Sequence, residues 1–95
     1  MPVKVRIPAP LRMLTKNQPV VSAEGKTVVE ILKDLEGQYP GLWERLCDET
    51  GHIRRFVNIF VNGEDVRGRG DQAAPVPDGA EVSIVPAIAG GVVRS

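Results

Sequence analysis

Two adjacent glycines near the C-terminus are the residues best suited to chemistry in this chain. Gly90 and Gly91 follow a segment with the pattern of a β-strand, and four residues come after them. Because glycine lacks a side chain, such a segment can enter a narrow crevice in extended form. It would deliver a terminal carboxylate to a nucleotide-binding enzyme. The alternative is a loose chain end in which glycine is merely tolerated.

The cysteine and histidine content excludes several kinds of site. The only cysteine, Cys47, cannot form an internal disulfide or a four-cysteine iron–sulfur or zinc site, and the only histidine, His52, cannot build a histidine-rich metal site. Next to Leu46, we expect Cys47 to be a small buried residue rather than a sulfur-bearing nucleophile. The sequence therefore predicts no bound cofactor, no metal and no enzyme chemistry within the chain.

Three other features have simpler structural interpretations. The basic run His52-Ile53-Arg54-Arg55 is typical of a solvated loop rather than a phosphate site. The segment 24–27 lacks the upstream glycine of a phosphate-binding loop. Trp43 has the side chain of an interface anchor, but packing in the core, or partly in it, is the favoured interpretation.

Length and charge limit the class of protein. The chain has 95 residues, which fits one domain, and 12 basic residues balance 12 acidic ones. Without a global basic field, neither nucleic acid nor an anionic membrane is an expected partner. The alternating N-terminus lacks the apolar run of a signal peptide, and no stretch approaches the length of a membrane span. We expect a cytoplasmic protein.

The first half of the chain predicts two strands and a helix. Apolar and charged residues alternate over 3–7, before Pro8 and Pro10 end the run, and a second short strand is expected over 19–23. Thr27 and Glu30 form a capping box that starts a helix of about ten residues. Gly37 and Pro40 bound its end, and a short second helix or turn is expected over 42–47.

The second half predicts a hairpin and a last strand. Residues 56–61 form the strongest strand, and Asn62-Gly63 is the signal of a tight turn, with Val66 on the returning limb. A loop follows over 68–77, then a turn over 77–79 and a last strand over 82–86.

Strand alternation divides residues 56–61 between two faces of the sheet. Val57, Ile59 and Val61 are expected to face the helix, so Phe56, Asn58 and Phe60 lie on the opposite face. Phe60 is then a candidate docking residue for a partner protein. The alternative is that the loop over 8–18 or the loop over 68–77 folds over it.

The order of elements predicts an α+β fold with one main helix packed on a mixed sheet of four to five strands. With the helix as a crossover, the first and last strands are expected to be parallel. This order is that of the β-grasp, or ubiquitin-like, fold. Residues 1–87 are expected to form the β-grasp domain. Residues 88–95 form a flexible tail, which carries the diglycine and a four-residue extension.

Nearly the whole chain resembles the bacterial ubiquitin-like sulfur carriers, which include the molybdopterin-synthase small subunit and the thiamine-biosynthesis carrier. The resemblance rests on Arg55-Phe56-Val57-Asn58-Ile59-Phe60-Val61-Asn62-Gly63-Glu64-Asp65-Val66-Arg67 and on Val82-Ser83-Ile84-Val85-Pro86-Ala87-Ile88-Ala89-Gly90-Gly91. With Ile7-Pro8 and Leu11-Arg12, these segments look most like the carrier of the alternative cysteine-synthesis route.

The resemblance implies chemistry at Gly91 that partners catalyse. An adenylating enzyme related to the ubiquitin-activating enzymes would use ATP-Mg to activate the glycine carboxylate, which sulfur would convert to a thiocarboxylate. That sulfur would pass to a biosynthetic enzyme, in the cysteine branch a pyridoxal-phosphate enzyme, and a zinc metallopeptidase would release the product. The residues expected to dock on a partner are Phe60, Ile88 and Ala89.

One feature departs from the mature pattern of that family. Val92-Val93-Arg94-Ser95 follows Gly91, so the glycine carboxylate is tied up in a peptide bond. Either a peptidase removes these residues by cutting between Gly91 and Val92, or they are a remnant of cloning. The alternatives to a cysteine-route carrier are a molybdopterin-synthase small subunit, a protein modifier conjugated to lysines, and a plain β-grasp binding module.

Overall fold

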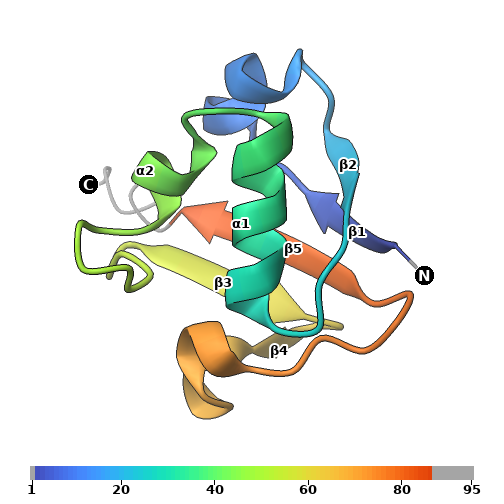
Figure 1. Ribbon diagram of the computed structural model, residues 1–95, viewed down its shortest axis with the longest axis vertical. Helices are drawn as coiled ribbons and strands as arrows, with labels where there is room; N and C mark the ends of the chain where they lie inside the picture. Colours follow the sequence, from blue (N-terminus) through green and yellow to red (C-terminus); the bar gives the residue numbers. More distant parts are fainter. Residues whose placement is uncertain (1, 87–95) are drawn as a thin grey trace.

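The computed structural model describes residues 2–86 of the chain, and in it one main helix packs on one face of a five-stranded sheet (Figure 1). The strands are β1 (Val3–Arg6), β2 (Val20–Ala23), β3 (Val57–Val61), β4 (Glu64–Asp65) and β5 (Glu81–Pro86). The α-helices are α1 (Val28–Gln38) and α2 (Leu42–Leu46). Three 3₁₀ helices complete the fold: η1 (Ala9–Thr15), η2 (Val66–Gly68) and η3 (Asp71–Ala73).

The sheet has the order β2-β1-β5-β3-β4, so the last strand is its central strand. β5 pairs with β1 in parallel and with β3 antiparallel, while β1–β2 and β3–β4 are antiparallel neighbours. The predicted parallel pairing of the first and last strands is confirmed. With one main helix crossing this mixed sheet, the β-grasp fold is confirmed as well.

The core lies between the sheet and α1. The helix contributes a stripe of residues at helical spacing, Val28, Ile31, Leu32 and Leu35, each at most 1% exposed. The sheet opposes it with the inward residues of its long strands, among them Val5, Val21, Ile59 and Val82. Trp43 packs partly buried against this core, as predicted.

The N-terminus of α1 is capped nearly as the sequence predicts. Thr27 Oγ1 accepts a hydrogen bond from the Glu30 amide at 3.4 Å. The Glu30 carboxylate accepts from the Lys26 amide at 2.8 Å, one residue earlier than in the usual reciprocal box. Segment 24–27 is thus used to start the helix.

The junction between α1 and α2 depends on Glu36, which the sequence analysis did not single out. Its Oε1 accepts hydrogen bonds from the amides of Gly41 (3.1 Å) and Trp43 (2.9 Å), amides that α2 itself leaves without partners. The end of α1 lies between Gly37 and Pro40, as predicted. The helix ends at Gln38, two residues before Pro40.

The β3–β4 hairpin turns at Asn62 and Gly63, which have φ of 51° and 86°, as the predicted tight turn requires. Val66 does not lie on the returning strand. β4 has only two residues, and Val66 begins η2 with its side chain 1% exposed. Burying Val66 requires the chain to leave the sheet edge there, which the strand prediction missed.

Candidate functional site

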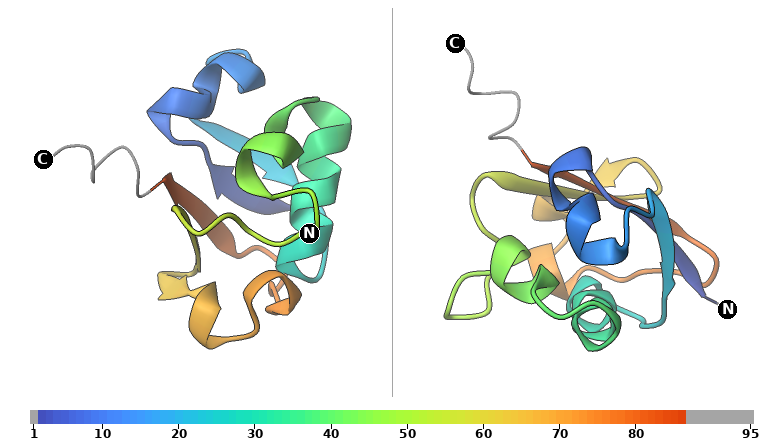
Figure 2. Two further views of the ribbon diagram at one scale, coloured as in Figure 1. Left: turned by 90° about the vertical axis from the view of Figure 1, so that its left-hand side faces the viewer. Right: turned by 90° about the horizontal axis from the view of Figure 1, so that it is seen from above.

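The functional candidate is the end of the sheet at which β5 has its C-terminal residue (Figure 2). Pro86 is the last residue that the structure describes, at the C-terminal end of β5. The predicted sulfur-carrying residues Gly90 and Gly91, the cleavage site Gly91–Val92 and the predicted docking residues Ile88 and Ala89 lie outside the described residues. The surroundings of Pro86 are called the tail root here.

The tail root is held by β3 on one side, and β5 has a second neighbour, β1, only as far as Ser83. Pro86 is the register partner of Val57, and Val85 is that of Asn58, on β3. On the other side, β5 pairs with β1 through Arg6 and Ser83. These pairings fix the position and direction of the chain, from both neighbours as far as Ser83 and from β3 alone up to Pro86.

Arg67 fastens the segment that leads into β3. Its guanidinium donates hydrogen bonds to the backbone carbonyls of Arg55 (2.9 Å), Val57 (2.7 Å) and, at 3.3 Å, Arg54, and to the side-chain oxygen of Asn58. The planar fork of arginine suits several acceptors at once. Because Val57 and Asn58 are the partners of Pro86 and Val85, Arg67 stabilises the tail root from the far side of β3.

Sequence reasoning missed Arg67 because its contacts reach back along the chain to backbone oxygens. Such contacts leave no periodicity or spacing signal. Arg67 lies in the segment 55–67 that resembles the sulfur carriers, and this resemblance is the only signal of it in the sequence.

The face of the sheet opposite α1 bears no helix among residues 2–86 (Figure 2). This surface is called the open face. Val57, Ile59 and Val61 point into the core with 2%, 1% and 8% exposure, so the predicted assignment of the two faces of β3 is confirmed. Phe60 lies on the open face, half-buried, between its register partners Ser83 and Asp65.

The loop over 68–77 does not cover Phe60. It packs on the helix layer, where the Val28 amide donates to the Ala74 carbonyl and the Val76 amide to the Lys26 carbonyl. The loop over 8–18 sends Leu14 toward Gly41 at the start of α2. Docking through Phe60 stays a prediction, because its burial alone does not identify a partner.

Cys47 is buried at 1% exposure, as predicted. Burial, followed by the negative charge of Asp48, raises the pKa of its thiol to about 11, although Arg54 acts in the opposite direction. The thiolate is the nucleophilic form of cysteine, so a neutral, buried thiol is poorly suited to carry sulfur.

The basic run 52–55 lies in an irregular segment, as predicted. Arg54 donates two hydrogen bonds to the Glu44 carbonyl, at 3.0 and 3.1 Å. Before it, Asp48 accepts from the Thr50 hydroxyl at 2.6 Å and from the amides of Thr50 and His52. These hydrogen bonds, that of the hydroxyl first, lower the pKa of the Asp48 carboxyl. The residues organise a loop rather than an anion site.

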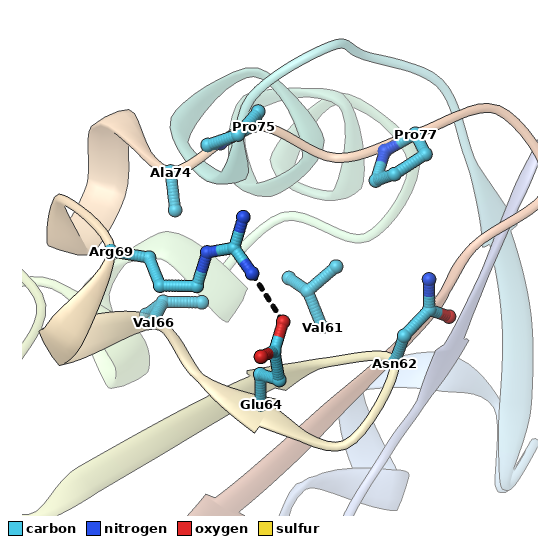
Figure 3. A pocket seen from close by; sticks show the side chains of 8 residues that line it. All are labelled: Val61, Asn62, Glu64, Val66, Arg69, Ala74, Pro75 and Pro77. Atoms are coloured by element: carbon cyan, nitrogen blue, oxygen red, sulfur yellow. Dashed lines mark hydrogen bonds and ion pairs between the residues drawn. The ribbon is translucent and has the colours of Figure 1, made fainter.

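The pocket beneath the β3–β4 hairpin is too small for a cofactor (Figure 3). It measures about 80 Å³, against roughly 300 Å³ or more for typical ligand sites. An ion pair between Arg69 and Glu64 spans it. It also lies at the end of β3 opposite the tail root.

Within residues 2–86, no cluster of three or more histidine, cysteine, aspartate or glutamate side chains is placed to bind a metal ion. None of the described helices has the length and apolar character to cross a membrane.

Comparison with known proteins identifies the family. The model described as "ThiS family" matches residues 5–91, a match that ends on the second glycine. The chain belongs to the ThiS family. The prediction of a ubiquitin-like carrier protein rather than an enzyme is confirmed by this membership.

The predicted branch within the ThiS family is also confirmed. The chain is 50% identical over 93 residues to the sulfur carrier protein CysO of Mycobacterium tuberculosis, covering 96% of this chain and all of that one. Its structure matches that of an Amycolatopsis orientalis BexX/CysO complex, with a TM-score of 0.89 and 45% identity over 94% of this chain and 99% of that one.

A further relative has a different name. Over 65 residues, the chain is 40% identical to the small archaeal modifier protein 3 of Haloferax volcanii, covering 68% of this chain and 70% of that one.

Proposed function

We propose that this protein carries sulfur as a thiocarboxylate on Gly91, formed in the cytoplasm after residues 92–95 have been removed. The observation that carries the proposal is the family match, which runs through the domain and ends on the diglycine. The 50% identity to a protein named as a sulfur carrier supports it.

The chemistry requires two steps at the Gly91 carboxylate. A carboxylate is a poor electrophile, so one of its oxygens first attacks the α-phosphorus of ATP-Mg, which releases pyrophosphate and leaves an acyl-adenylate. Sulfide then attacks the acyl carbon, and AMP departs with the bonding electron pair. If a persulfide attacks instead, an acyl disulfide forms, and a second thiol cleaves its S–S bond, which releases the thiocarboxylate and leaves the two other sulfur atoms as a disulfide. The product is a thiocarboxylate, whose anionic sulfur is the nucleophile.

The contribution of this chain is shape and position, since both steps are catalysed by partners. These partners are an adenylating enzyme related to the ubiquitin-activating enzymes and a sulfur-accepting biosynthetic enzyme. In a cysteine route, the acceptor is a pyridoxal-phosphate enzyme, and a zinc metallopeptidase releases the product. The complex of the Amycolatopsis orientalis CysO with BexX supports the view that proteins of this shape bind protein partners.

Intact mass of the protein recovered from its own cells tests the proposal. The expected species ends at Gly91 and is heavier than the plain chain by the mass difference between sulfur and oxygen. A protein modifier is the second candidate, which the identity to an archaeal modifier protein favours. Ladders of heavier conjugates without the sulfur-bearing form would support the modifier and contradict the carrier.

Cleavage of the tail is tested separately. Incubating the full chain with host lysate should release residues 92–95, and a zinc chelator should prevent this. If thiocarboxylate forms while only the 95-residue mass is ever observed, removal of the tail is not required.

Substitution of the last glycine tests which residue is activated. In a chain ending at residue 91, Gly91→Ala should strongly slow ATP–pyrophosphate exchange by the adenylating enzyme, because the added methyl group narrows the backbone freedom of the end. Thermal melting of the same variant controls for folding. An unchanged exchange rate would show that Gly91 is not the activated residue.

A further inference from the structure

The connection between β1 and β2 is long for two neighbouring antiparallel strands. It spans residues 7–19, whereas hairpin loops commonly have about two to five residues. Within it, η1 continues for 7 residues, although 3₁₀ helices rarely exceed about three or four. The connection is therefore longer than the joining of two neighbouring strands requires.

This connection is held in one conformation at some cost. Lys16 and Asn17 have φ of 56° and 63°, two consecutive left-handed positions without glycine. The Thr15 side chain, 0% exposed, holds the turn by donating to the Gln18 carbonyl at 2.9 Å. Left-handed residues of this kind persist where the surroundings fix them, and they concentrate at functional sites.

Two neighbouring side chains of η1 are presented to the outside in different ways. Met13 is 74% exposed, the largest exposure among the large exposed hydrophobic residues described. Arg12 is half-buried, and its Nε donates to the Ile7 carbonyl at 3.1 Å. In the described part of the chain, the ion pairs are Arg6–Glu81 and Arg69–Glu64, so Arg12 has no carboxylate partner there.

Arg12 lies next to the tail root. It lines a hollow of about 300 Å³ together with residues of β1, of the connection and of β5, among them Arg6, Pro8, Pro19, Ser83 and Val85. Val85 directly precedes Pro86, and Figure 2 shows η1 beside the C-terminal end of β5.

Exposed apolar side chains also occur on the open face, where Val20 and Val85 lie because their strand neighbours Val21 and Ile84 face the core. Among residues 2–86, the large hydrophobic residues with high exposure are Met13, Val20, Phe56 and Val85. They belong to η1, to β2, to the residue before β3 and to β5, and none belongs to α1 or α2. Exposed apolar residues that gather on one side mark an interaction surface, and those scattered singly do not.

Chain length limits how far an activating enzyme can stand from this surface. Gly91 is five residues beyond Pro86, and five residues span at most roughly 18 Å when fully extended. An enzyme that holds the Gly91 carboxylate in its active site therefore contacts the elements that border the tail root.

We propose that η1 is a docking element for the adenylating enzyme. Met13 enters an apolar recess of the enzyme, and Arg12 pairs with a carboxylate beside the channel that receives the tail. A guanidinium and a carboxylate form paired, geometrically specific hydrogen bonds. The inference rests on the proposed function, because it assumes that Gly91 is activated by such an enzyme.

The test is ATP–pyrophosphate exchange with the adenylating enzyme of the same organism and chains ending at Gly91. Arg12→Glu should raise the KM for the carrier about ten-fold at low salt and leave kcat nearly unchanged, since the tail is intact. Added salt should shrink the difference from wild type, because it screens the opposed charges. Met13→Ala should raise KM without this salt dependence.

Lys33→Glu is the matched control. It makes the same change in charge on the exposed side of α1, away from the open face, and should leave KM within about two-fold of wild type. If thermal melting shows that Arg12→Glu does not fold, Arg12→Gln takes its place in the test, because it removes the positive charge without adding a negative one.

The outcomes separate the two proposals. No exchange with the wild-type chain overturns the proposed function itself. Normal exchange with wild type, together with Arg12 and Met13 variants that match it, overturns the docking element alone. Equal defects in Arg12→Glu and Lys33→Glu would show an effect of net charge and overturn it as well.

Discussion

At the scale of single residues, the two faces of β3 separate stability from recognition. Ile59 points into the core and is 1% exposed, while its neighbour Phe60 lies half-buried on the open face. Two adjacent side chains of similar apolar character thus differ in what surrounds them, and a pair of substitutions can distinguish what each does.

Phe60→Ala should weaken binding to the adenylating enzyme by about 2–4 kcal/mol, as for an interface hot spot. Its cost in stability should be below the roughly 3–5 kcal/mol expected for a fully buried phenylalanine, because the side chain is only half-buried. Calorimetric binding and denaturant melts of one variant measure both.

Ile59→Ala is the control on the opposite face. It should cost about 2–5 kcal/mol of stability and leave the affinity of the folded fraction unchanged. A large stability loss with normal affinity in Phe60→Ala would instead place Phe60 in the core and contradict docking through it.

Cys47 provides a second residue-scale prediction, on pH. Its thiol pKa rises from 9.0 to about 11 on folding. Below pH 9 the thiol is neutral in both states, and between these values only the unfolded chain ionises. The stabilisation from the neutral buried thiol is therefore lost as pH rises from 9.0 toward about 11.

The measurement is the free energy of unfolding of wild type and of Cys47→Ala over that range. Taking the difference between the two free energies of unfolding removes the contribution of other titrating groups. The stability of wild type relative to Cys47→Ala should fall as pH rises. A constant difference would mean that burial does not perturb the thiol. The variant should still form thiocarboxylate, because Cys47 is not expected to carry sulfur.

At the scale of elements, two glycines near α1 have opposite requirements. A Cβ on Gly25 would lie 2.7 Å from Glu30 Cβ and 2.9 Å from the backbone nitrogen of Ile31. A Cβ on Gly37, inside α1, would meet nothing within 4 Å. The turn before the helix therefore needs glycine, and the helix itself does not.

Gly25→Ala should destabilise the protein by about 1–3 kcal/mol, since the first turn of α1 must move away from the new methyl group. Gly37→Ala should stabilise it by about 0.5–1 kcal/mol, because alanine is the better helix former. Thermal melts of the two variants compare these effects directly, and equal shifts of the same sign would contradict the close packing of the turn.

The elements that the sequence predicts are those fixed by neighbouring residues. The capping pair Thr27–Glu30 and the turn at Asn62-Gly63 act within a few positions, so their pattern is readable in the chain. The 3₁₀ helix η1 and the early end of β4 are not, because they depend on burying Leu11, Leu14 and Val66 against distant elements. The hydrogen bonds of Arg67 to residues 54–58 leave no pattern in the sequence, for the same reason.

At the scale of the whole molecule, the chain divides into a packed domain, called the body here, and the C-terminal segment on which partners are proposed to act. All the buried hydrophobic residues described lie between Val3 and Ile84. Because β5 occupies the centre of the sheet, the chain leaves the body from a position that its neighbouring strands determine. The recognition surfaces proposed here, the open face and η1, border that position.

Truncation tests the predicted boundary between residues 1–87 and the tail 88–95. A chain ending at residue 87 keeps every core residue described, so its free energy of unfolding should stay within about 0.5 kcal/mol of that of the full chain. It should give no pyrophosphate exchange. A chain ending at residue 80, which lacks β5, should not fold, because the removal leaves β1 and β3 without their common partner. If the chain ending at residue 87 melts far below wild type, residues 88–95 contribute to the body and the boundary is wrong.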